Sequence, residues 1–208
     1  MTTTSSMADG DPSHLALLEL CDKLDSIFEN QDAELRAVEA IHRLGAGAEV
    51  PREYLYGEVQ SLAFASLLLH FAVRLPNGHG GGTFVDLGSG SGKALAVASA
   101  ALGGDVFGAV LGVEIVPELC ELSVELLDCV HLEVEATRQT TSEVRCDSFL
   151  EDTSWTQGDF VYANTCAWPD ELLAKVATLA EGMRPGSRFI TLNRHLPSAV
   201  FRRIGMRR

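Results

Sequence analysis

Apolar and polar residues follow one another along this chain in a pattern that predicts helices first and alternating strands and helices afterwards. From residue 13 to residue 44, apolar side chains recur at intervals of three and four, which predicts two helices divided near Asn30 and Gln31. Residues 56–75 are almost continuously apolar. We expect a single, largely buried helix there.

Beyond residue 82, short apolar runs alternate with helical patterns, which is typical of a parallel, doubly wound α/β sheet with its ligand at the carboxyl ends of the strands. The segment 131–141 is compatible with a continuation of the helix before it. Only 15 residues follow the last predicted strand, so we expect either a truncated chain or a sheet that lacks its C-terminal strands. The predicted strands are 83–87, 109–114, 142–147, 159–163 and 187–193, and the predicted helices between them are 92–102, 117–130 and 169–182.

This pattern divides the chain into three parts. Residues 1–12 are small and polar and are expected to be disordered. Residues 13–53 form an N-terminal helical appendage, which could be a lid on the substrate side or only a cap on the core. Residues 54–208 form the main α/β domain.

Composition narrows the class of protein. The chain has 208 residues, of which 46% are hydrophobic, enough for a sizeable core, yet no apolar run approaches the roughly 18–20 residues that span a bilayer. The N-terminus lacks the pattern of a secretory signal. Five scattered cysteines form no Cys-x-x-Cys pair and have no histidine at zinc spacing. We therefore expect an intracellular protein with reduced thiols, no metal site and no membrane association.

The net charge of −13 is unevenly distributed. Residues 182–208 contain seven arginines and no acid, whereas the rest of the chain is strongly acidic. An acidic chain is a poor nonspecific nucleic-acid binder, so direct binding of nucleic acid is expected to be weak at most and confined to this basic segment. The segment could dock an acidic or nucleic-acid-associated partner, or it could be only a solvated terminus.

The most distinctive motif is the segment 86–92, Asp-Leu-Gly-Ser-Gly-Ser-Gly, between an apolar run and a helix. Most nicotinamide and flavin loops place their third glycine one residue later, and a phosphate-binding loop would need glycine in place of Leu87 and Ser or Thr in place of Ala94. The pattern, with Glu114 ending the next strand, is similar to that of S-adenosyl-L-methionine-dependent methyltransferases. Glycine has no Cβ atom, so Gly88, Gly90 and Gly92 would let the backbone approach the ligand closely. Ser89, between the first two glycines, is also expected to bind the cofactor.

That similarity implies roles for the acids at three strand ends. Asp86 would support the glycine turn and face the methionine part of the cofactor. Glu114 could accept hydrogen bonds from both ribose hydroxyls, or be an ordinary acid at a strand end. Asp147 could accept the adenine amino group, with Ser148 and Phe149 flanking the ring, or it could cap a turn.

The fourth strand ends in a group of residues suited to the methyl acceptor. Methyl transfer needs positioning and an uncharged nucleophile, so a lysine acceptor must first lose its proton, which a dry pocket and a nearby positive charge favour. The side-chain amide of Asn164 could hold the acceptor nitrogen. Tyr162 and Trp168 could form the pocket wall, although core packing is equally plausible for one of them.

With these residues placed, the chain resembles the disruptor-of-telomeric-silencing (Dot-one-like) non-SET histone-lysine methyltransferases over residues 54–193. The resemblance implies a class I methyltransferase fold, S-adenosyl-L-methionine as cofactor with S-adenosyl-L-homocysteine as product, a histone substrate and a nuclear location. It also implies that Glu58 contacts the amino-acid end of the cofactor and that Asn164 matches one asparagine of the family's Asn-Asn-Phe-Ala-Phe turn. The matching segments are 56–58 (Tyr-Gly-Glu), 84–92, 112–114, 145–150, 163–168 and 179–190.

Three departures leave alternatives open. The turn after the fourth strand has one asparagine, lysine-rich nucleosome-contacting segments are not evident, and the chain ends where substrate-side strands would form. The acceptor could then be a non-histone protein, a small molecule or RNA, and the protein could be cytoplasmic. The chain could also be a catalytically silent module that only binds cofactor or a partner.

Overall fold

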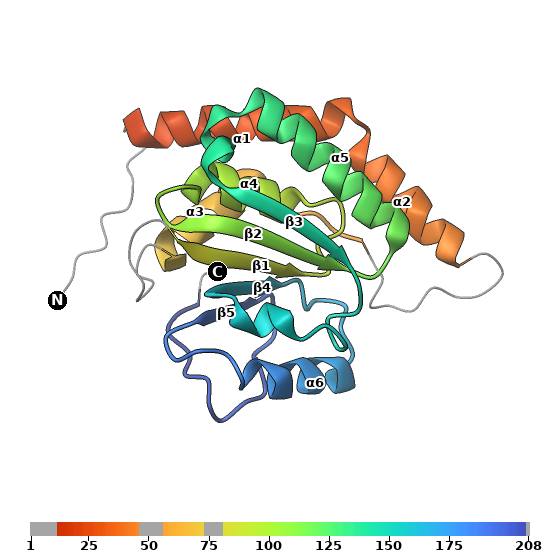
Figure 1. The fold of residues 1–208 in the computed structure, drawn as a ribbon, viewed down its shortest axis with the longest axis vertical. Helices are drawn as coiled ribbons and strands as arrows, with labels where there is room; N and C mark the ends of the chain where they lie inside the picture. The colour runs from red at the N-terminus through yellow and green to blue at the C-terminus, as the bar shows by residue number, and fades with distance from the viewer. Residues whose placement is uncertain (1–11, 46–55, 73–80, 207–208) are drawn as a thin grey trace.

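The computed structural model describes residues 12–45, 56–72 and 81–206. The described residues form an α/β fold with helices above and below one sheet (Figure 1). The helices are α1 (Pro12–Asn30), α2 (Ala33–Leu44), α3 (Ser61–Ala72), α4 (Lys93–Leu102), α5 (Pro117–Glu133) and α6 (Asp170–Ala180), with 3-10 turns at Glu135–Gln139 and Ser154–Gln157. The strands are β1 (Gly82–Leu87), β2 (Phe107–Glu114), β3 (Thr141–Cys146), β4 (Phe160–Ala163) and β5 (Arg188–Thr191).

The five strands are all parallel and run in the order β3-β2-β1-β4-β5. Helices α4 and α5 connect the strands on one side of β1 and cover one face, whereas α6 connects β4 to β5 and covers the other (Figure 1). This arrangement confirms the predicted doubly wound sheet, and the order reverses between β1 and β4, where such sheets bind ligands. Residues 192–206 form no strand, in agreement with the expectation that the sheet ends at its fifth strand.

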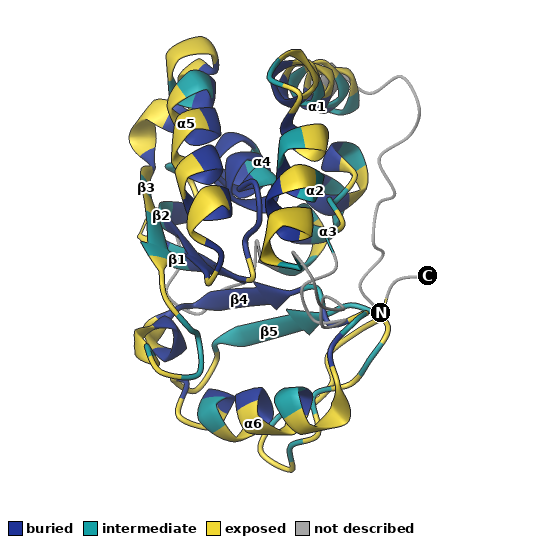
Figure 2. Ribbon diagram, turned by 90° about the vertical axis from the view of Figure 1, so that its right-hand side faces the viewer, coloured by how far each residue is buried: buried dark blue, intermediate teal, exposed yellow. Residues whose placement is uncertain are grey.

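The central strands β1, β2 and β4 are mostly buried, and successive residues of each contribute to the cores on opposite faces of the sheet (Figure 2). In β1, Phe84 packs beneath α3 and α4, whereas Val85 and Leu87 face α6. In β4, the ring of Phe160 lies 6.0 Å from that of Phe84 on the first face. This two-sided burial explains why the central strands are mainly apolar in sequence.

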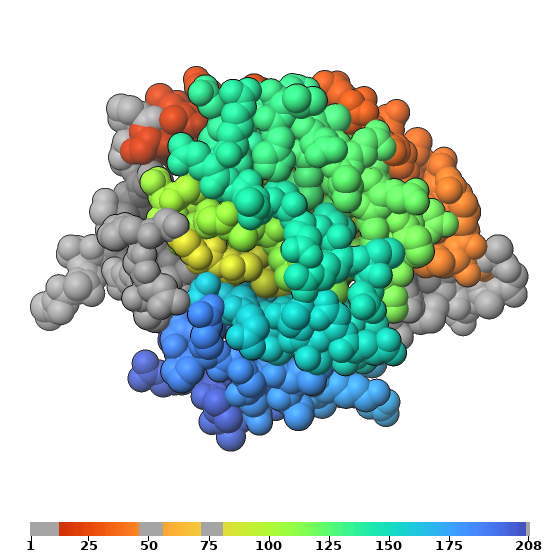
Figure 3. Space-filling view, viewed as in Figure 1, coloured from red at the N-terminus to blue at the C-terminus, as the bar shows by residue number. Residues whose placement is uncertain are grey.

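The two N-terminal helices pack over α3, α4 and α5 and share their core. Leu24, Phe28 and Ala37 are almost completely buried in the same cluster as Phe84. On the outside, Arg36 of α2 makes a two-pronged ion pair with Glu125 of α5. Figure 3 shows the outer surface of this layer, where α1 and α2 lie beside α5 above the edge of β3.

Two predicted helices need correction. Residues 56–60 are irregular and α3 begins at Ser61, so the predicted helix over 56–75 starts too early; its last residues lie outside the described part. The helix before β3 ends at Glu133 and does not continue to 141, because Val134 is extended and buried and a 3-10 turn follows. The predicted disordered segment 1–12 lies outside the described residues, except that Pro12 begins α1.

Candidate functional site

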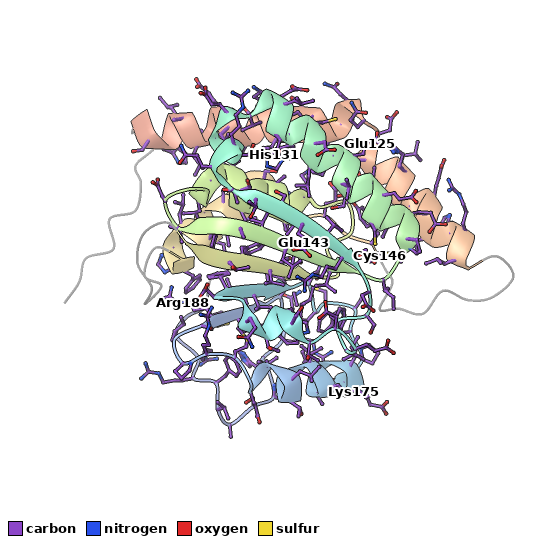
Figure 4. The ribbon with its side chains drawn as sticks, viewed as in Figure 1. Glu125, His131, Glu143, Cys146, Lys175 and Arg188 are labelled. Atoms are coloured by element: carbon purple, nitrogen blue, oxygen red, sulfur yellow. The ribbon has the colours of Figure 1, made fainter. Side chains whose placement is uncertain are left out.

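A cavity of about 990 Å³ lies at the carboxyl ends of the strands, the end marked in Figure 4 by Cys146, the last residue of β3. Its volume is at the upper end of the roughly 300–1,000 Å³ typical of small-molecule sites. Most of the predicted site residues line this cavity. Those that line the cavity are Glu58, Asp86, Gly88, Ser89, Gly90, Glu114, Ser148, Phe149, Tyr162, Asn164 and Trp168; Gly92 and Asp147 do not.

The glycine turn has the backbone that its sequence requires. Gly88, Gly90 and Gly92 all have positive φ angles, at 78°, 55° and 83°. A Cβ atom on Gly92 would lie 2.3 Å from the hydroxyl oxygen of Ser123, whereas one on Gly88 would meet no atom within 4 Å. Gly92 is thus required for packing at the start of α4, while Gly88 borders the open space of the cavity.

Glu114 is held rigidly at the end of β2. One carboxylate oxygen accepts a hydrogen bond from the Gly90 N–H at 2.9 Å, and the other accepts from Ile115 at 2.9 Å and Val116 at 3.0 Å. Burial raises the pKa of Glu114, and these three N–H groups oppose the shift. Since a carboxylate has about four acceptor positions, Glu114 keeps acceptor capacity for one further donor on its cavity side.

Asp86 and Tyr162 are neighbours in the β1–β4 register, and both line the cavity. Burial, and then the charge of Glu114, raise the pKa of Asp86 well above its usual range. The Tyr162 hydroxyl is buried and has no hydrogen-bond partner among the described residues. Burial, and then the charge of Asp86, raise the pKa of Tyr162, so the hydroxyl stays protonated. A buried hydroxyl without a partner in a lined cavity indicates a place for a polar ligand group.

Of the three residues predicted to bind at the end of the third strand, Ser148 and Phe149 line the cavity and Asp147 does not. Asp147 is exposed, and its carboxylate accepts a hydrogen bond from the Ser148 N–H at 2.7 Å, which is the turn-capping arrangement. Its own N–H donates to the Glu114 carbonyl at 2.9 Å. Phe149 reaches the cavity, where its ring stacks on Trp168 with centroids 5.2 Å apart. An adenine contact by Asp147 remains a prediction.

The turn after β4 is fastened to the residues that follow β5. The side-chain oxygen of Asn164 accepts a hydrogen bond from the Cys166 N–H at 3.3 Å, and the Thr165 hydroxyl donates to the Leu192 carbonyl at 2.6 Å. The Arg194 guanidinium donates to the carbonyl of Trp168. Asn164 is therefore partly occupied within its own turn, and Trp168 both packs in the α6-side core and lines the cavity.

Sequence reasoning missed Lys93 as a residue of the cavity wall. Its ammonium lies 3.2 Å from Glu58 and 2.9 Å from Asp25 of α1. The signal for Lys93 was present, because it directly follows the third glycine, but no spacing could reveal Asp25. The charged residues at the described wall are then three acids, Glu58, Asp86 and Glu114, and one lysine. This balance favours a ligand with positive charge and hydroxyl donors over one with phosphates.

Comparison with known proteins identifies the family. The sequence profile described as "Histone methylation protein DOT1" matches residues 48–204. The chain belongs to the DOT1 family. No curated protein matches it in sequence. The DOT1 match agrees with the observed fold, which is the Rossmann-like fold of class I methyltransferases, enzymes whose cofactor is S-adenosylmethionine.

A solved structure supports the fold. The rRNA methyltransferase aviRa from Streptomyces viridochromogenes is 16% identical, with a TM-score of 0.50 over 69% of this chain and 78% of that one. A SAM-dependent methyltransferase from Thiobacillus denitrificans in complex with S-adenosyl-L-homocysteine is 18% identical, with a TM-score of 0.45 over 62% of this chain. The match covers 47% of that second protein, so the chain spans about half its length. Among the described helices of this chain, none has the length and hydrophobicity needed to cross a bilayer.

Proposed function

We propose that this DOT1-family chain is an S-adenosylmethionine-dependent protein-lysine methyltransferase and that its substrate is a histone, which would place it in the nucleus. The observation that carries the proposal is the coincidence of the family match with a cavity built from that family's expected residues. The family match supports the histone substrate, and the cavity supports the cofactor. The bound cofactor would supply an activated methyl group.

The cavity wall fits this cofactor in charge and shape. Glu114 would accept a ribose hydroxyl with its remaining acceptor capacity, and Ser148 and Phe149 would border the adenine. The acidic side chains of Asp86 and Glu58 would face the cationic methionine part, whose positive charge would offset the unfavourable burial of Asp86. The open space beside Gly88 leaves room for backbone approach.

The acceptor would enter beside the turn that follows β4. Tyr162, Asn164 and Trp168 all line the cavity there. Asn164 would orient the lysine amine, while the buried rings of Tyr162 and Trp168 would exclude water. A low-polarity environment lowers the pKa of a lysine, which favours the uncharged amine needed for attack.

Calorimetry with S-adenosylhomocysteine tests the cofactor assignment. The parent chain should bind, and Glu114→Ala should weaken binding by roughly 1–3 kcal/mol, the range for losing a hydrogen bond to a charged group. The variant should also melt at a lower temperature, because three N–H groups, two of them buried, lose their acceptor, so affinity must be compared below its transition. Tight binding of NAD without a response to S-adenosylhomocysteine would contradict the assignment.

A transfer assay tests the acceptor. Tritiated S-adenosylmethionine is supplied with nucleosomes, free histones, total RNA and a cell lysate, and the labelled species is identified. Label on histone lysine supports the proposal. Label confined to RNA or to another protein would assign a different acceptor, and cofactor binding without any transfer would indicate a silent module.

A further inference from the structure

Lys93 occupies a position where a cation is unfavourable on its own. It is the first residue of α4, directly after the N-cap Gly92, and the N-terminus of a helix carries partial positive charge. Its side chain is only 14% exposed. Burial alone would lower the pKa of Lys93, yet hydrogen bonds and charges from Asp25 and Glu58 outweigh that effect and raise it.

Two carboxylates from distant parts of the chain hold this ammonium. Asp25 of α1 lies 2.9 Å away and Glu58 lies 3.2 Å away. The Ser61 hydroxyl donates to Asp25 at 2.7 Å, so Asp25 is itself fixed. The ring of Phe28, one turn further along α1, lies 5.6 Å below the ammonium.

Glu58 completes the connection to the cavity. One oxygen faces Lys93, and the other accepts hydrogen bonds from the Ser91 hydroxyl at 2.8 Å and from the Tyr56 hydroxyl. Both oxygens are thereby fixed at the wall, although residues 56–60 belong to no helix or strand. Since Asp25 and Glu58 share one ammonium, their oxygens lie at most about 6 Å apart, where like charges repel without the intervening cation.

We propose that Asp25 and Lys93 are positioning residues of the cofactor site: Asp25 on α1 fixes Lys93, and Lys93 fixes the Glu58 carboxylate at the cavity wall. This inference rests on the proposed function, because it assigns Glu58 to the cofactor. Under this proposal, α1 contributes to the affinity for the cofactor, although Asp25 itself does not line the cavity.

A double-mutant cycle separates positioning from general stability. The variants are Asp25→Asn, Glu58→Gln and the double variant, each measured for S-adenosylhomocysteine affinity by calorimetry and for melting temperature. Asp25→Asn keeps the shape of the side chain but removes its charge. We expect it to weaken binding about threefold to tenfold in the parent, the size of a moderate coupling between residues in one network. Asp25→Asn should have no further effect on affinity in the Glu58→Gln background, because the Glu58 carboxylate through which Asp25 acts on the ligand is then absent.

Glu125→Gln is the matched control. It breaks the Arg36–Glu125 ion pair, which also fastens the N-terminal layer but lies on the outer surface (Figure 4 labels Glu125). Its affinity should equal that of the parent. If the parent binds S-adenosylhomocysteine and Asp25→Asn binds it equally well, this inference alone is overturned. The same holds if Asp25→Asn loses the same affinity in the parent and in the Glu58→Gln background. Absence of binding by the parent overturns the proposed function and this inference with it.

Discussion

At the scale of single residues, the Tyr162 hydroxyl offers a specific test for a ligand group in the cavity. Most buried polar atoms in native proteins have a partner, and an unpartnered one lowers stability by about 1–3 kcal/mol. This hydroxyl lies in a residue that is only 2% exposed, beside Asp86, and lines the cavity. Its ring packs at 4.7 Å from that of Phe64, so the phenol position is fixed.

Replacing Tyr162 by Phe removes only this oxygen. We expect the ligand-free variant to be as stable as the parent or more stable, since an unsatisfied group disappears. Turnover should fall by about tenfold, the effect of one hydrogen bond worth roughly 1.4 kcal/mol. Thermal unfolding and the transfer assay check the two parts. A more stable variant with full turnover would show that the hydroxyl has no ligand to contact.

At the scale of elements, the sequence was sufficient where the local pattern and the tertiary contacts agree. The strand positions followed from apolar runs, and β1 to β5 begin and end within about two residues of the prediction. The late start of α3, at Ser61 instead of residue 56, was missed mainly because its cause is tertiary: the Glu58 carboxylate pairs with Lys93 and accepts a hydrogen bond from Ser91. The low helix propensity of Gly57 acts in the same direction. The hydrophobic periodicity of the sequence carries no information about either contact of Glu58.

The same difference between local and tertiary contacts decides which residues of the candidate site could be predicted from the sequence. Glu114 and the glycine turn could be predicted because a strand, a turn and a helix are adjacent in sequence. Asp25 could not, because 68 positions separate it from Lys93 and only the packing of α1 on α4 brings the two together. The sequence could not show that Asp147 lies outside the cavity lining, because the direction of a side chain beyond a strand end depends on the turn, where the Asp147 carboxylate accepts a hydrogen bond from the Ser148 N–H.

The start of α4 provides a prediction at this scale. Gly92→Ala and Gly88→Ala impose similar backbone strain, because both residues have positive φ angles near 80°. Only the methyl group of the first meets Ser123 of α5. Gly92→Ala should therefore be less stable than Gly88→Ala by roughly 1–3 kcal/mol, the usual effect of overpacking. Urea unfolding measures the difference, and equal stabilities would mean that α4 and α5 adjust without strain.

At the scale of the whole molecule, the basic C-terminal segment runs away from the cavity. Arg194 contacts Trp168 at the cavity, but a Cβ on Gly205 would lie 2.7 Å from the ring of Phe71, in the last turn of α3. Helix α3 starts at Ser61, which contacts Asp25, and is about 18 Å long at 1.5 Å per residue. The end of the segment thus lies toward the opposite end of the sheet, the end marked by Arg188 in Figure 4.

The path of the C-terminal segment limits the role that its arginines can have in substrate binding. Arg184 and Arg194 are engaged with Asp159 and Asp170, whereas Arg202 and Arg203 are exposed. Arg203 contacts the ring of His195 at 3.3 Å, and the chain then continues toward Phe71. We therefore expect these two arginines not to orient a lysine at the turn that follows β4. A partner as large as a nucleosome could still contact both regions at once. The exposed arginines would then add affinity through phosphates and leave the chemical step unaltered.

We therefore expect Arg202→Ala/Arg203→Ala to raise KM for nucleosomes, with kcat and S-adenosylhomocysteine affinity unchanged. The loss should be largest near about 50 mM salt and shrink at higher salt, where the parent also loses phosphate contacts. Arg138→Ala/Lys175→Ala is the control, because it removes the same charge from exposed positions on other elements. If both double variants behave alike, only net charge matters and the segment is a solvated terminus. A fall in kcat specific to the first would instead place these arginines at the reacting lysine, contrary to the course of the chain.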